Sequence, residues 1–400
     1  MKMQAISDRQ ESRNLNTQPI EGSQVNVSDW VFCVGVAIWS LNEFIKFSEI
    51  ADYMSTFWPL SFRFVGIVLV VASFFLRDFL SIDAVRFFAV VGLLGFFTIN
   101  NGLLAGDANW IDIAILSIAS IGVHYDKVFS FLASYRVILN GALIALVALS
   151  ILPNQVQVSQ SRLRFYWGYN WTSFIAHTIL FITLLFLWSR RGRIGYLLFL
   201  GLFTVNFWAY FQTQTKAPFI ITAFCLIVWF IAAKFKVRFI HSRIVLIGTV
   251  CAVPILTLLI VYLSYHASSF PRINGLLSNR LSLGRTYLDQ YGLTMFGHTI
   301  YDMTDFDWFG SVYQTLDSSL MRYVVKYGLV SSFLFVGTWM YVSWRIAKLH
   351  DFYLDLLLVC LALEAFGDPW FLFASYNIFI ILIGSVALRE DQFDFAFRTT

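Results

Sequence analysis

The sequence predicts an all-α polytopic integral membrane protein with about twelve transmembrane helices and one large extracytoplasmic loop. Hydrophobic residues make up 58% of the 400 residues and charged residues only 13%, and the mean hydropathy is +0.70. A soluble domain averages roughly 25% charged residues. A chain of this length cannot bury so much apolar surface in its own core, so lipid must cover the remainder. One long polar and aromatic stretch, at 265–328, interrupts the apolar runs.

The hydropathy pattern divides the chain into five segments. Residues 1–27 are polar and predict a disordered cytoplasmic tail, and no cleavable signal peptide precedes the first apolar run. Residues 28–264 predict the first nine transmembrane helices, and residues 265–320 predict an extracytoplasmic loop with an interfacial helix. Residues 321–388 predict the last three transmembrane helices, and residues 389–400 a second cytoplasmic tail.

Each predicted membrane crossing is an apolar run close to the required length of about 20 residues. In chain order the candidate spans are 30–47, 58–76, 83–101, 110–124, 131–152, 171–189, 194–211, 217–233, 243–264, 321–344, 352–367 and 370–388. The fourth and the eleventh are short. The sequence shows no internal repeat of the kind that marks many secondary transporters.

The distribution of Lys and Arg predicts the orientation. With the N-terminus placed in the cytoplasm, most of these residues fall in cytoplasmic segments, as the positive-inside rule requires. The sequence therefore predicts a multi-pass protein with both termini inside and the long loop outside. The net charge of +4 is too small to indicate nucleic-acid binding. The cysteines lie in apolar runs without metal-ligand spacing, so no metal site is predicted: Cys33, Cys225, Cys251 and Cys360.

Cations on the predicted outer side run against this bias and indicate an anion bound there. An extracytoplasmic site has no nucleotide sugar or ATP to use, so the expected anion is a lipid-linked phosphate. Two predicted helices begin at the outer face beside a cation, one at Thr215 with Lys216 and one at 317–319 before Arg322. Capping residues and free N–H groups at a helix N-terminus favour anions. Ordinary capping explains either helix start alone, and the added cations favour an anion site.

Residues 276–293 predict an amphipathic helix lying flat at the membrane interface. Positions 277, 281, 284 and 288 form an apolar stripe at helical spacing. At about 100° per residue, Arg280 and Arg285 lie on opposite flanks of that stripe. Such a helix is a surface anchor at headgroup level, or its two guanidiniums clamp a pyrophosphate, which suits their bidentate geometry.

Several further segments, taken in order, carry a resemblance to a known family. They are Gly168-Tyr-Asn-Trp-Thr-Ser-Phe-Ile-Ala176, Thr213-Gln-Thr-Lys-Ala-Pro-Phe219, Leu277-Ser-Asn-Arg-Leu-Ser-Leu-Gly284, Leu293-Thr-Met-Phe-Gly-His-Thr-Ile300, the run from Asp317-Ser-Ser-Leu to Lys326-Tyr-Gly-Leu-Val330, and Glu364-Ala-Phe-Gly-Asp368 followed by Asn377. In order and spacing they resemble segments of the Wzy-type polysaccharide polymerases, which share a superfamily of polytopic glycosyltransferases with the O-antigen ligases. The resemblance covers most of 165–388.

The resemblance implies a GT-C-like fold and the polymerisation of undecaprenyl-diphosphate-linked oligosaccharide repeat units into capsular polysaccharide or exopolysaccharide. The reaction is expected at the outer face of a bacterial cytoplasmic membrane, where a sugar hydroxyl attacks an anomeric carbon and lipid diphosphate leaves. Cations can stabilise that leaving group without a metal, and no cofactor is expected. The expected partners are the lipid-linked oligosaccharide, the bilayer, and a flippase and a chain-length regulator of the same pathway.

Two departures from the family pattern and a set of candidate residues complete the prediction. Lys216 replaces the usual arginine, and Asp317 stands where ligases commonly carry His, which favours a polymerase. Asp317 is the first candidate for general base, followed by His298 and Asp368. The acids Glu43 and Glu364 lie within predicted spans, where a buried acid is costly; each is either worth testing for a role in the site or simply paired with a polar neighbour. The candidate diphosphate- and sugar-binding residues are Arg280, Arg285, Lys216, Arg322, Arg164, Asn170 and Tyr313.

Two alternative functions remain open at this point. An O-antigen ligase-type transferase is the nearest enzymatic alternative, and a flippase for lipid-linked oligosaccharides is the alternative from another class. A flippase predicts repeat symmetry, charges lining a central cavity and short loops. The large loop and the outward cations favour the polymerase instead.

Overall fold

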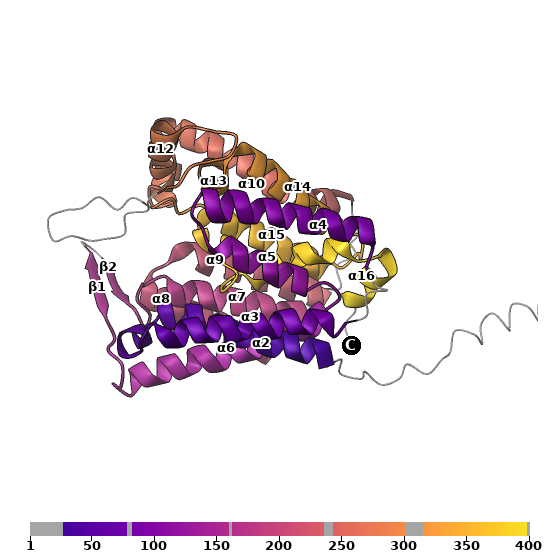
Figure 1. Ribbon diagram of the computed structural model, residues 1–400. Coiled ribbons are helices and arrows are strands. Elements are labelled where there is room, and N and C mark those ends of the chain that lie inside the picture. The colour runs from indigo at the N-terminus through magenta and orange to yellow at the C-terminus, as the bar shows by residue number, and fades with distance from the viewer. Residues whose placement is uncertain (1–26, 78–81, 160–161, 236–242, 301–314, 398–400) are drawn as a thin grey trace, which may run out of the picture.

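The computed structural model describes residues 27–77, 82–159, 162–235, 243–300 and 315–397. Most of these residues form helices that lie side by side in one bundle (Figure 1). The longer helices are α2 (Val27–Lys46), α3 (Phe57–Phe75), α4 (Ala84–Phe97), α5 (Asn109–Ala119), α6 (Tyr125–Ala148), α7 (Phe174–Arg190), α8 (Tyr196–Thr213), α9 (Lys216–Phe235), α10 (Arg243–Tyr265), α12 (Arg280–Tyr291), α14 (Gly328–Ala347) and α15 (Phe352–Gly367). The shorter elements are η1 (Glu49–Tyr53), the π-helix η3 (Thr98–Leu104), β1 (Val156–Ser159), β2 (Arg162–Phe165), η5 (Ala267–Ser269), α11 (Pro271–Leu276), α13 (Ser319–Lys326), η6 (Pro369–Leu372), η7 (Ile378–Ala387) and α16 (Glu390–Ala396).

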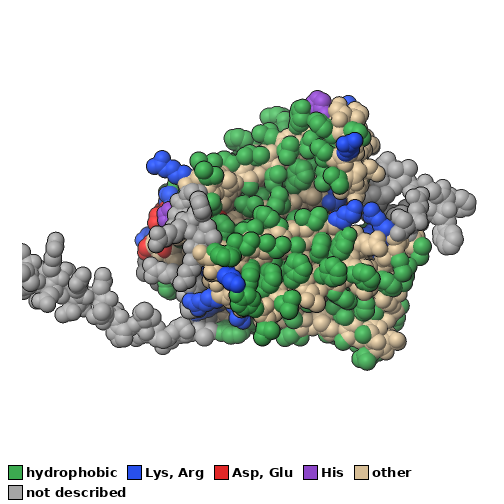
Figure 2. Space-filling view, turned by 180° about the vertical axis from the view of Figure 1, so that it is seen from behind, with side chains coloured by type: hydrophobic (Ala, Val, Ile, Leu, Met, Phe, Trp, Pro, Cys, Tyr) green, Lys and Arg blue, Asp and Glu red, His purple; other side chains and the backbone are tan. Residues whose placement is uncertain are grey.

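Among the described residues, five helical segments are long and apolar enough to cross a membrane. They are α3, α4 continued by η3, α6, α9 and α10. Large apolar side chains such as Ile138 and Leu258 point out of the bundle. Figure 2 shows that hydrophobic side chains cover the middle of one face, with Lys and Arg gathered toward its two ends. The prediction of a mainly helical membrane protein is confirmed to this extent.

The structure also contains one short element that is not helical and that the sequence analysis did not predict. The strands β1 and β2 form an antiparallel hairpin in which Val156 pairs with Phe165 and Ser159 with Arg162. Apolar and polar residues alternate in both strands, which is the period of a strand and not of a helix. The hairpin lies at the same end of the molecule as α12 (Figure 1).

The predicted span at 321–344 is two helices in the structure. α13 ends at Lys326 and α14 begins at Gly328, whose φ of +85° is a conformation that glycine adopts without strain. A Cβ at Gly328 would lie 2.3 Å from the Gly297 nitrogen. The Leu329 amide donates a hydrogen bond to the Thr294 carbonyl at 2.9 Å. The helix is therefore broken where a segment of the long loop docks on it.

The last predicted span, 370–388, also differs in the structure. Its residues form the 3₁₀ helices η6 and η7, and nearly all of η7 is buried. A 3₁₀ helix rises about 2.0 Å per residue against 1.5 Å for an α-helix, so η7 spans more distance with ten residues. A Cβ at Gly384 would lie 2.0 Å from the Ser117 carbonyl oxygen, so η7 packs directly on the backbone of α5.

Contacts between distant segments define two ends of the bundle. At one end, near α16, Ile82 forms a β-bridge with Leu388 and Arg86 pairs with Glu390 at 3.2 Å. At the other end, Ser48 bridges Tyr169, and the Asn170 side chain donates to the Lys46 carbonyl at 2.8 Å. The elements of the long loop, α11 and α12, belong to this second end (Figure 1).

Candidate functional site

α12 carries Arg280 at its first position and holds it against the bundle. The Asn274 side chain of α11 accepts hydrogen bonds from the amides of Leu281 and Ser282 at 3.1 and 3.2 Å, which satisfies the free N–H groups at the start of α12. Gly284 faces α10, where a Cβ would lie 2.6 Å from the Ser264 hydroxyl. The apolar face of the predicted amphipathic helix therefore packs on protein and not on lipid.

The guanidinium of Arg280 lies between two carboxylates. Its Nη2 contacts Asp368 Oδ1 at 2.6 Å, its Nη1 donates to the Gly367 carbonyl, and its Nε lies 3.5 Å from Asp317 Oδ2. The Arg280, Asp317 and Asp368 side chains are 20%, 15% and 3% exposed. Three of the predicted site residues, which come from three segments of the chain, thus meet in one largely buried cluster.

Two fully buried side chains extend this cluster into the bundle. His177 of α7 places Nδ1 2.8 Å from Glu364 Oε1 and Nε2 3.5 Å from Asp368 Oδ1. Glu364 and Asp368 stand one turn apart, because the Asp368 amide donates to the Glu364 carbonyl at the end of α15. Pro369 then ends the helix. A chain of contacts therefore runs from Glu364 through His177, Asp368 and Arg280 to Asp317; we call these five residues the buried relay.

The start of α13 fixes the outer part of the buried relay. The Ser318 hydroxyl accepts from the Met321 amide at 3.3 Å, so Ser318 is the N-cap that the sequence predicted at 317–319. The Ser319 amide and hydroxyl both donate to the Asp368 carbonyl, at 3.1 and 2.7 Å. These bonds hold Asp317 and Asp368 at a fixed separation on either side of Arg280.

Arg280 stays charged in this setting. Burial by itself would lower the pKa of its guanidinium, but the neighbouring Asp368 and Asp317 carboxylates raise that pKa above its ordinary value. The cation is therefore permanent, and its Nε atom has no hydrogen-bond partner within the described residues. That free donor faces the more exposed carboxylate, Asp317.

The spacing of three relay side chains would admit a metal ion, but their orientation does not favour one. His177, Glu364 and Asp368 can each bring one ligand atom within 4.8 Å of the others. However, the imidazole meets Glu364 with one nitrogen and Asp368 with the other, on different edges of the ring. A single ion can bind only one of those nitrogens. Arg280 already occupies Asp368, so we interpret these side chains as partners of one another.

Lys216 and Arg164 lie at the turn between α8 and α9, which borders the buried relay. A Cβ at Gly367 would lie 3.5 Å from Arg280 Nη1 and 3.8 Å from the Ala217 Cβ, so the first turn of α9, with exposed Lys216, borders the relay. Arg164 of β2 donates to the Thr213 carbonyl at 2.6 Å and to the Thr215 hydroxyl at 3.2 Å. Arg164 therefore stabilises the turn between α8 and α9, and the Thr215 hydroxyl accepts a hydrogen bond from Arg164.

The remaining predicted binding residues are spread around this end of the molecule. Arg285 points away from Arg280: its Nε pairs with Asp289 at 2.8 Å and its Nη1 donates to the Tyr265 carbonyl at 3.0 Å. The two arginines therefore do not clamp one ligand in this structure. Arg322 is buried in α13 and donates to the Leu316 carbonyl at 3.3 Å.

His298, Asn170 and Tyr313 complete the predicted set. The His298 amide donates to the Lys326 carbonyl at 2.9 Å. His298 therefore lies at the C-terminal end of α13, whereas Asp317 precedes its N-terminal end. Asn170 ties the loop before α7 to the end of α2. Tyr313 lies outside the described residues.

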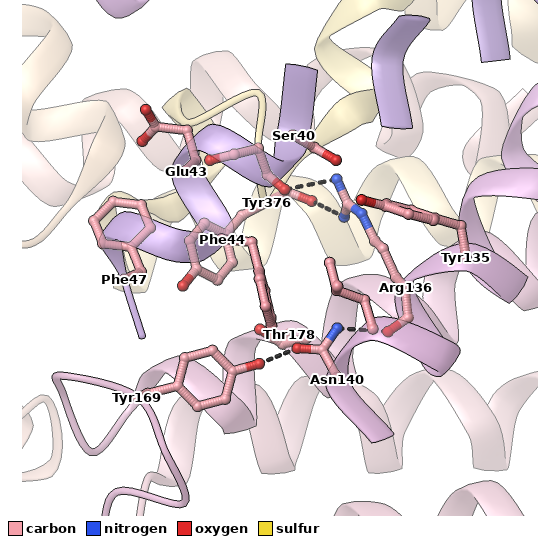
Figure 3. A pocket seen from close by; sticks show the side chains of 12 residues that line it. Ser40, Glu43, Phe44, Phe47, Tyr135, Arg136, Asn140, Tyr169, Thr178 and Tyr376 are labelled. Atoms are coloured by element: carbon pink, nitrogen blue, oxygen red, sulfur yellow. Dashed lines mark hydrogen bonds between the residues drawn. The ribbon is translucent and has the colours of Figure 1, made fainter. Parts of the chain in front are cut away.

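A pocket lies next to the buried relay, between α2, α6, the start of α7 and Ser375–Tyr376. In Figure 3 the Arg136 guanidinium points at the backbone of this last segment, where it donates to the Ser375 and Tyr376 carbonyls, each at 2.6 Å. The lining residues are Ser40, Glu43, Phe44, Phe47, Tyr135, Arg136, Leu139, Asn140, Tyr169, Thr178, Ser375 and Tyr376. Ring centroids put Trp370 5.7 Å from His177 and 4.7 Å from Tyr376. One layer of aromatic rings therefore separates the pocket from the relay.

Sequence reasoning missed His177. It follows directly after the segment 168–176, inside an apolar run, where an isolated histidine reads as a core residue. A signal was present, because an ionisable residue within a membrane helix is costly and calls for a partner. The same signal singles out its partner Glu364. No protein-family model, curated protein or solved structure matches this chain, so a function has to follow from its own residues and their geometry.

Proposed function

We propose that the protein is a membrane glycosyltransferase that polymerises undecaprenyl-diphosphate-linked oligosaccharide repeat units at the outer face of a bacterial cytoplasmic membrane. The observation that carries this proposal is the meeting of Arg280, Asp317 and Asp368. They come from three separate segments of the family resemblance, and a fourth segment, at 213–219, borders them through Ala217. Chance resemblance of unrelated segments gives no reason for them to converge.

The proposed membrane arrangement is a GT-C-like bundle of twelve crossings with both termini inside. Each of the twelve apolar runs contains a helix, counting the 3₁₀ helix η7 as the last. The contacts Arg86–Glu390 and Ser48–Tyr169 join chain segments that this topology assigns to the same side. The buried relay then opens at the outer face, where lipid-linked substrates are presented and where α12 lies.

The proposed mechanism uses Arg280 for the leaving group and Asp317 for the attacking hydroxyl. A permanent guanidinium whose Nε has only the 3.5 Å ion pair with Asp317, and no hydrogen bond within the described residues, can bind a diphosphate oxygen and stabilise the charge that develops as the anomeric C–O bond breaks. Asp317 is the more exposed of the two carboxylates, so it is the one a sugar hydroxyl reaches first. Its carboxylate accepts the hydroxyl proton while the hydroxyl oxygen bonds to the anomeric carbon.

The neighbouring pocket offers a place for one of the sugars. The partly exposed rings of Phe44 and Tyr135 can stack on a sugar face, and Glu43, which pairs with Lys46 at 3.2 Å, offers a carboxylate for hydroxyl groups. The Glu43 side chain is 21% exposed, so this wall of the pocket is open to substrate. The pocket and the buried relay are thus separated by one aromatic layer, which is close enough for two oligosaccharides to meet.

The test is polymer formation by the purified protein from synthetic lipid-linked repeat units, followed by gel analysis of chain length. Arg280→Ala should abolish polymer while the variant still inserts, and Asp317→Asn should reduce turnover by about 10² to 10⁴-fold, the usual contribution of a general base. Arg272→Ala, which removes an exposed arginine of α11 at the same end, is the matched control and should retain activity. Normal polymer from the Arg280 variant would refute the proposal, and transfer of a single unit to a lipid acceptor without polymer would favour a ligase.

Orientation can be tested separately by labelling. In a background with the native cysteines replaced, Thr286→Cys on exposed α12 should react with a membrane-impermeant maleimide added to intact cells. Asp394→Cys on α16 should react only after the cells are opened. The opposite pattern would place the buried relay at the cytoplasmic face and remove the proposed substrate.

A further inference from the structure

The charges of the buried relay do not balance. Glu364, Asp368 and Asp317 are three carboxylates, and Arg280 is the one permanent cation among them. If all three acids are ionised and His177 is neutral, the relay carries two net negative charges. Such a site repels the diphosphate that the proposed function requires it to bind, and uncompensated charge in a buried site is unstable.

His177 is placed to supply one of the two missing positive charges. Its two ring nitrogens face Glu364 at 2.8 Å and Asp368 at 3.5 Å, so an imidazolium would donate on both sides. The charged groups that face it are Glu364 and Asp368 from α15 and its cap, Arg280 from α12, and Asp317 behind Arg280. From η6 the neutral ring of Trp370 packs on it. The carboxylates nearest to His177 outnumber the cation and favour the charged ring.

The free acceptor atoms of the relay point to the same conclusion. Within the described residues, Glu364 Oε2, Asp368 Oδ2 and His177 Nε2 are buried and have no hydrogen-bond partner. If a neutral ring donates from Nδ1 to Glu364, its Nε2 lone pair faces Asp368 Oδ1, and these two electron-rich atoms repel each other. A proton on Nε2 turns the 3.5 Å contact with Asp368 into an attraction.

We propose that the relay binds a lipid diphosphate and a proton together, with His177 holding the proton. This inference rests on the proposed function for the identity of the anion. Protonation of His177 neutralises one carboxylate and leaves more of the Arg280 charge for the ligand. Binding of the anion in turn favours the proton, because linkage between the two is reciprocal.

The sign of the pH dependence follows from this coupling. Below the titration of His177 the relay holds its proton and diphosphate affinity is greatest. As the pH rises through that titration, the unliganded relay loses the proton, and each binding event must take one up again. Affinity then falls by up to about tenfold per pH unit, the limit for one linked proton.

The experiment measures binding of undecaprenyl diphosphate to the full-length protein in nanodiscs by microscale thermophoresis, from about pH 5.5 to about pH 8.5, the range in which histidine titrates. The wild-type protein should lose affinity steeply across part of this range. His177→Gln should bind more weakly at the acidic end and lose the steep part, leaving only the shallower titration of the ligand itself. Glu364→Gln removes the charge that favours the imidazolium, so it should move the midpoint to lower pH. His266→Gln, an exposed histidine at the end of α10, is the matched control and should behave as wild type.

Two results would overturn the inference: a wild-type affinity that does not change with pH, or the same steep pH dependence in the His177 and wild-type proteins. Thermal unfolding of each variant establishes whether a weak binder is folded. If His177→Gln does not fold, the shift of the midpoint in Glu364→Gln tests the inference instead. If the protein binds diphosphate with a linked proton but makes no polymer, the proposed reaction is refuted and this inference is supported. Polymer formation without proton-linked binding would do the reverse.

Discussion

Replacing Arg280 tests whether the buried relay depends on one guanidinium. Arg280→Ala removes the 2.6 Å contact with Asp368, the hydrogen bond to the Gly367 carbonyl and the cation beside Asp317. Asp368 is then left as a buried carboxylate with His177 as its remaining charged neighbour. Removing one partner of a buried ion pair costs about 3–5 kcal/mol, because the other charge stays buried without compensation.

The size of the expected effect can be checked against a neighbour on the same helix. Arg285→Ala removes a pair with Asp289 whose side chains are 41% and 58% exposed, and exposed pairs contribute about 0.2–1 kcal/mol. The double variant Arg280→Ala/Asp368→Asn removes the uncompensated charge as well. It should be more stable than Arg280→Ala alone, because no ionised carboxylate is then left at position 368 without its cation.

The assay is the apparent free energy of unfolding of the purified variants in a denaturant titration, with polymer synthesis measured on the same samples. Arg280→Ala should be the least stable of the three variants and inactive, and the double variant should regain stability without regaining activity. If Arg280→Ala and Arg285→Ala lose the same stability, the guanidinium is not held as the structure shows. If the double variant polymerises normally, Arg280 has no role with the leaving group.

Two further predictions concern the elements that position the relay. Gly328→Ala should destabilise the protein several times more than Gly337→Ala. A Cβ at Gly328 would lie 2.3 Å from the Gly297 nitrogen, at a φ of +85°, whereas a Cβ at Gly337 would meet open space. Equal unfolding midpoints for the two variants would contradict the docking of the loop on α14. Ser318→Ala should cost about 1 kcal/mol through loss of the helix cap on the Met321 amide, and Ser318→Thr, which keeps the capping hydroxyl, should recover most of that loss in the same titration.

Helix positions were the most predictable part of the fold. Apolar runs long enough to cross a bilayer exclude most alternatives, because lipid can accept only segments that satisfy their own backbone. The predicted span at 352–367 coincides with α15, and 58–76 differs from α3 by one residue at each end. Prediction failed where polar residues join a helix: α6 begins at Tyr125 and not at 131, because the indole of Trp188 and the guanidinium of Arg191 both bind Asp126.

The breaks in the last spans were not visible in hydropathy. Gly328 and the residues after Pro369 read as ordinary interruptions of apolar sequence. Their conformations follow from contacts with distant segments, namely Gly297 of the long loop and Ser117 of α5. Backbone packing of this kind depends on which segments meet, which hydropathy does not report.

The sequence by itself determined the class of the protein, the approximate ends of its helices and the residues Arg280, Asp317 and Asp368 as candidates. Each of these depends on local composition, capping or charge bias, which short segments carry. Only the tertiary structure showed that Arg285 points away from Arg280. It also brought His177 into contact with Asp368 and with Glu364, which lies 187 residues further along the chain. Which side chains pair in a buried ionic network depends on their distance in the folded protein. In a low-dielectric interior, a change of a few ångströms decides whether the interaction energy of two charges is large or small.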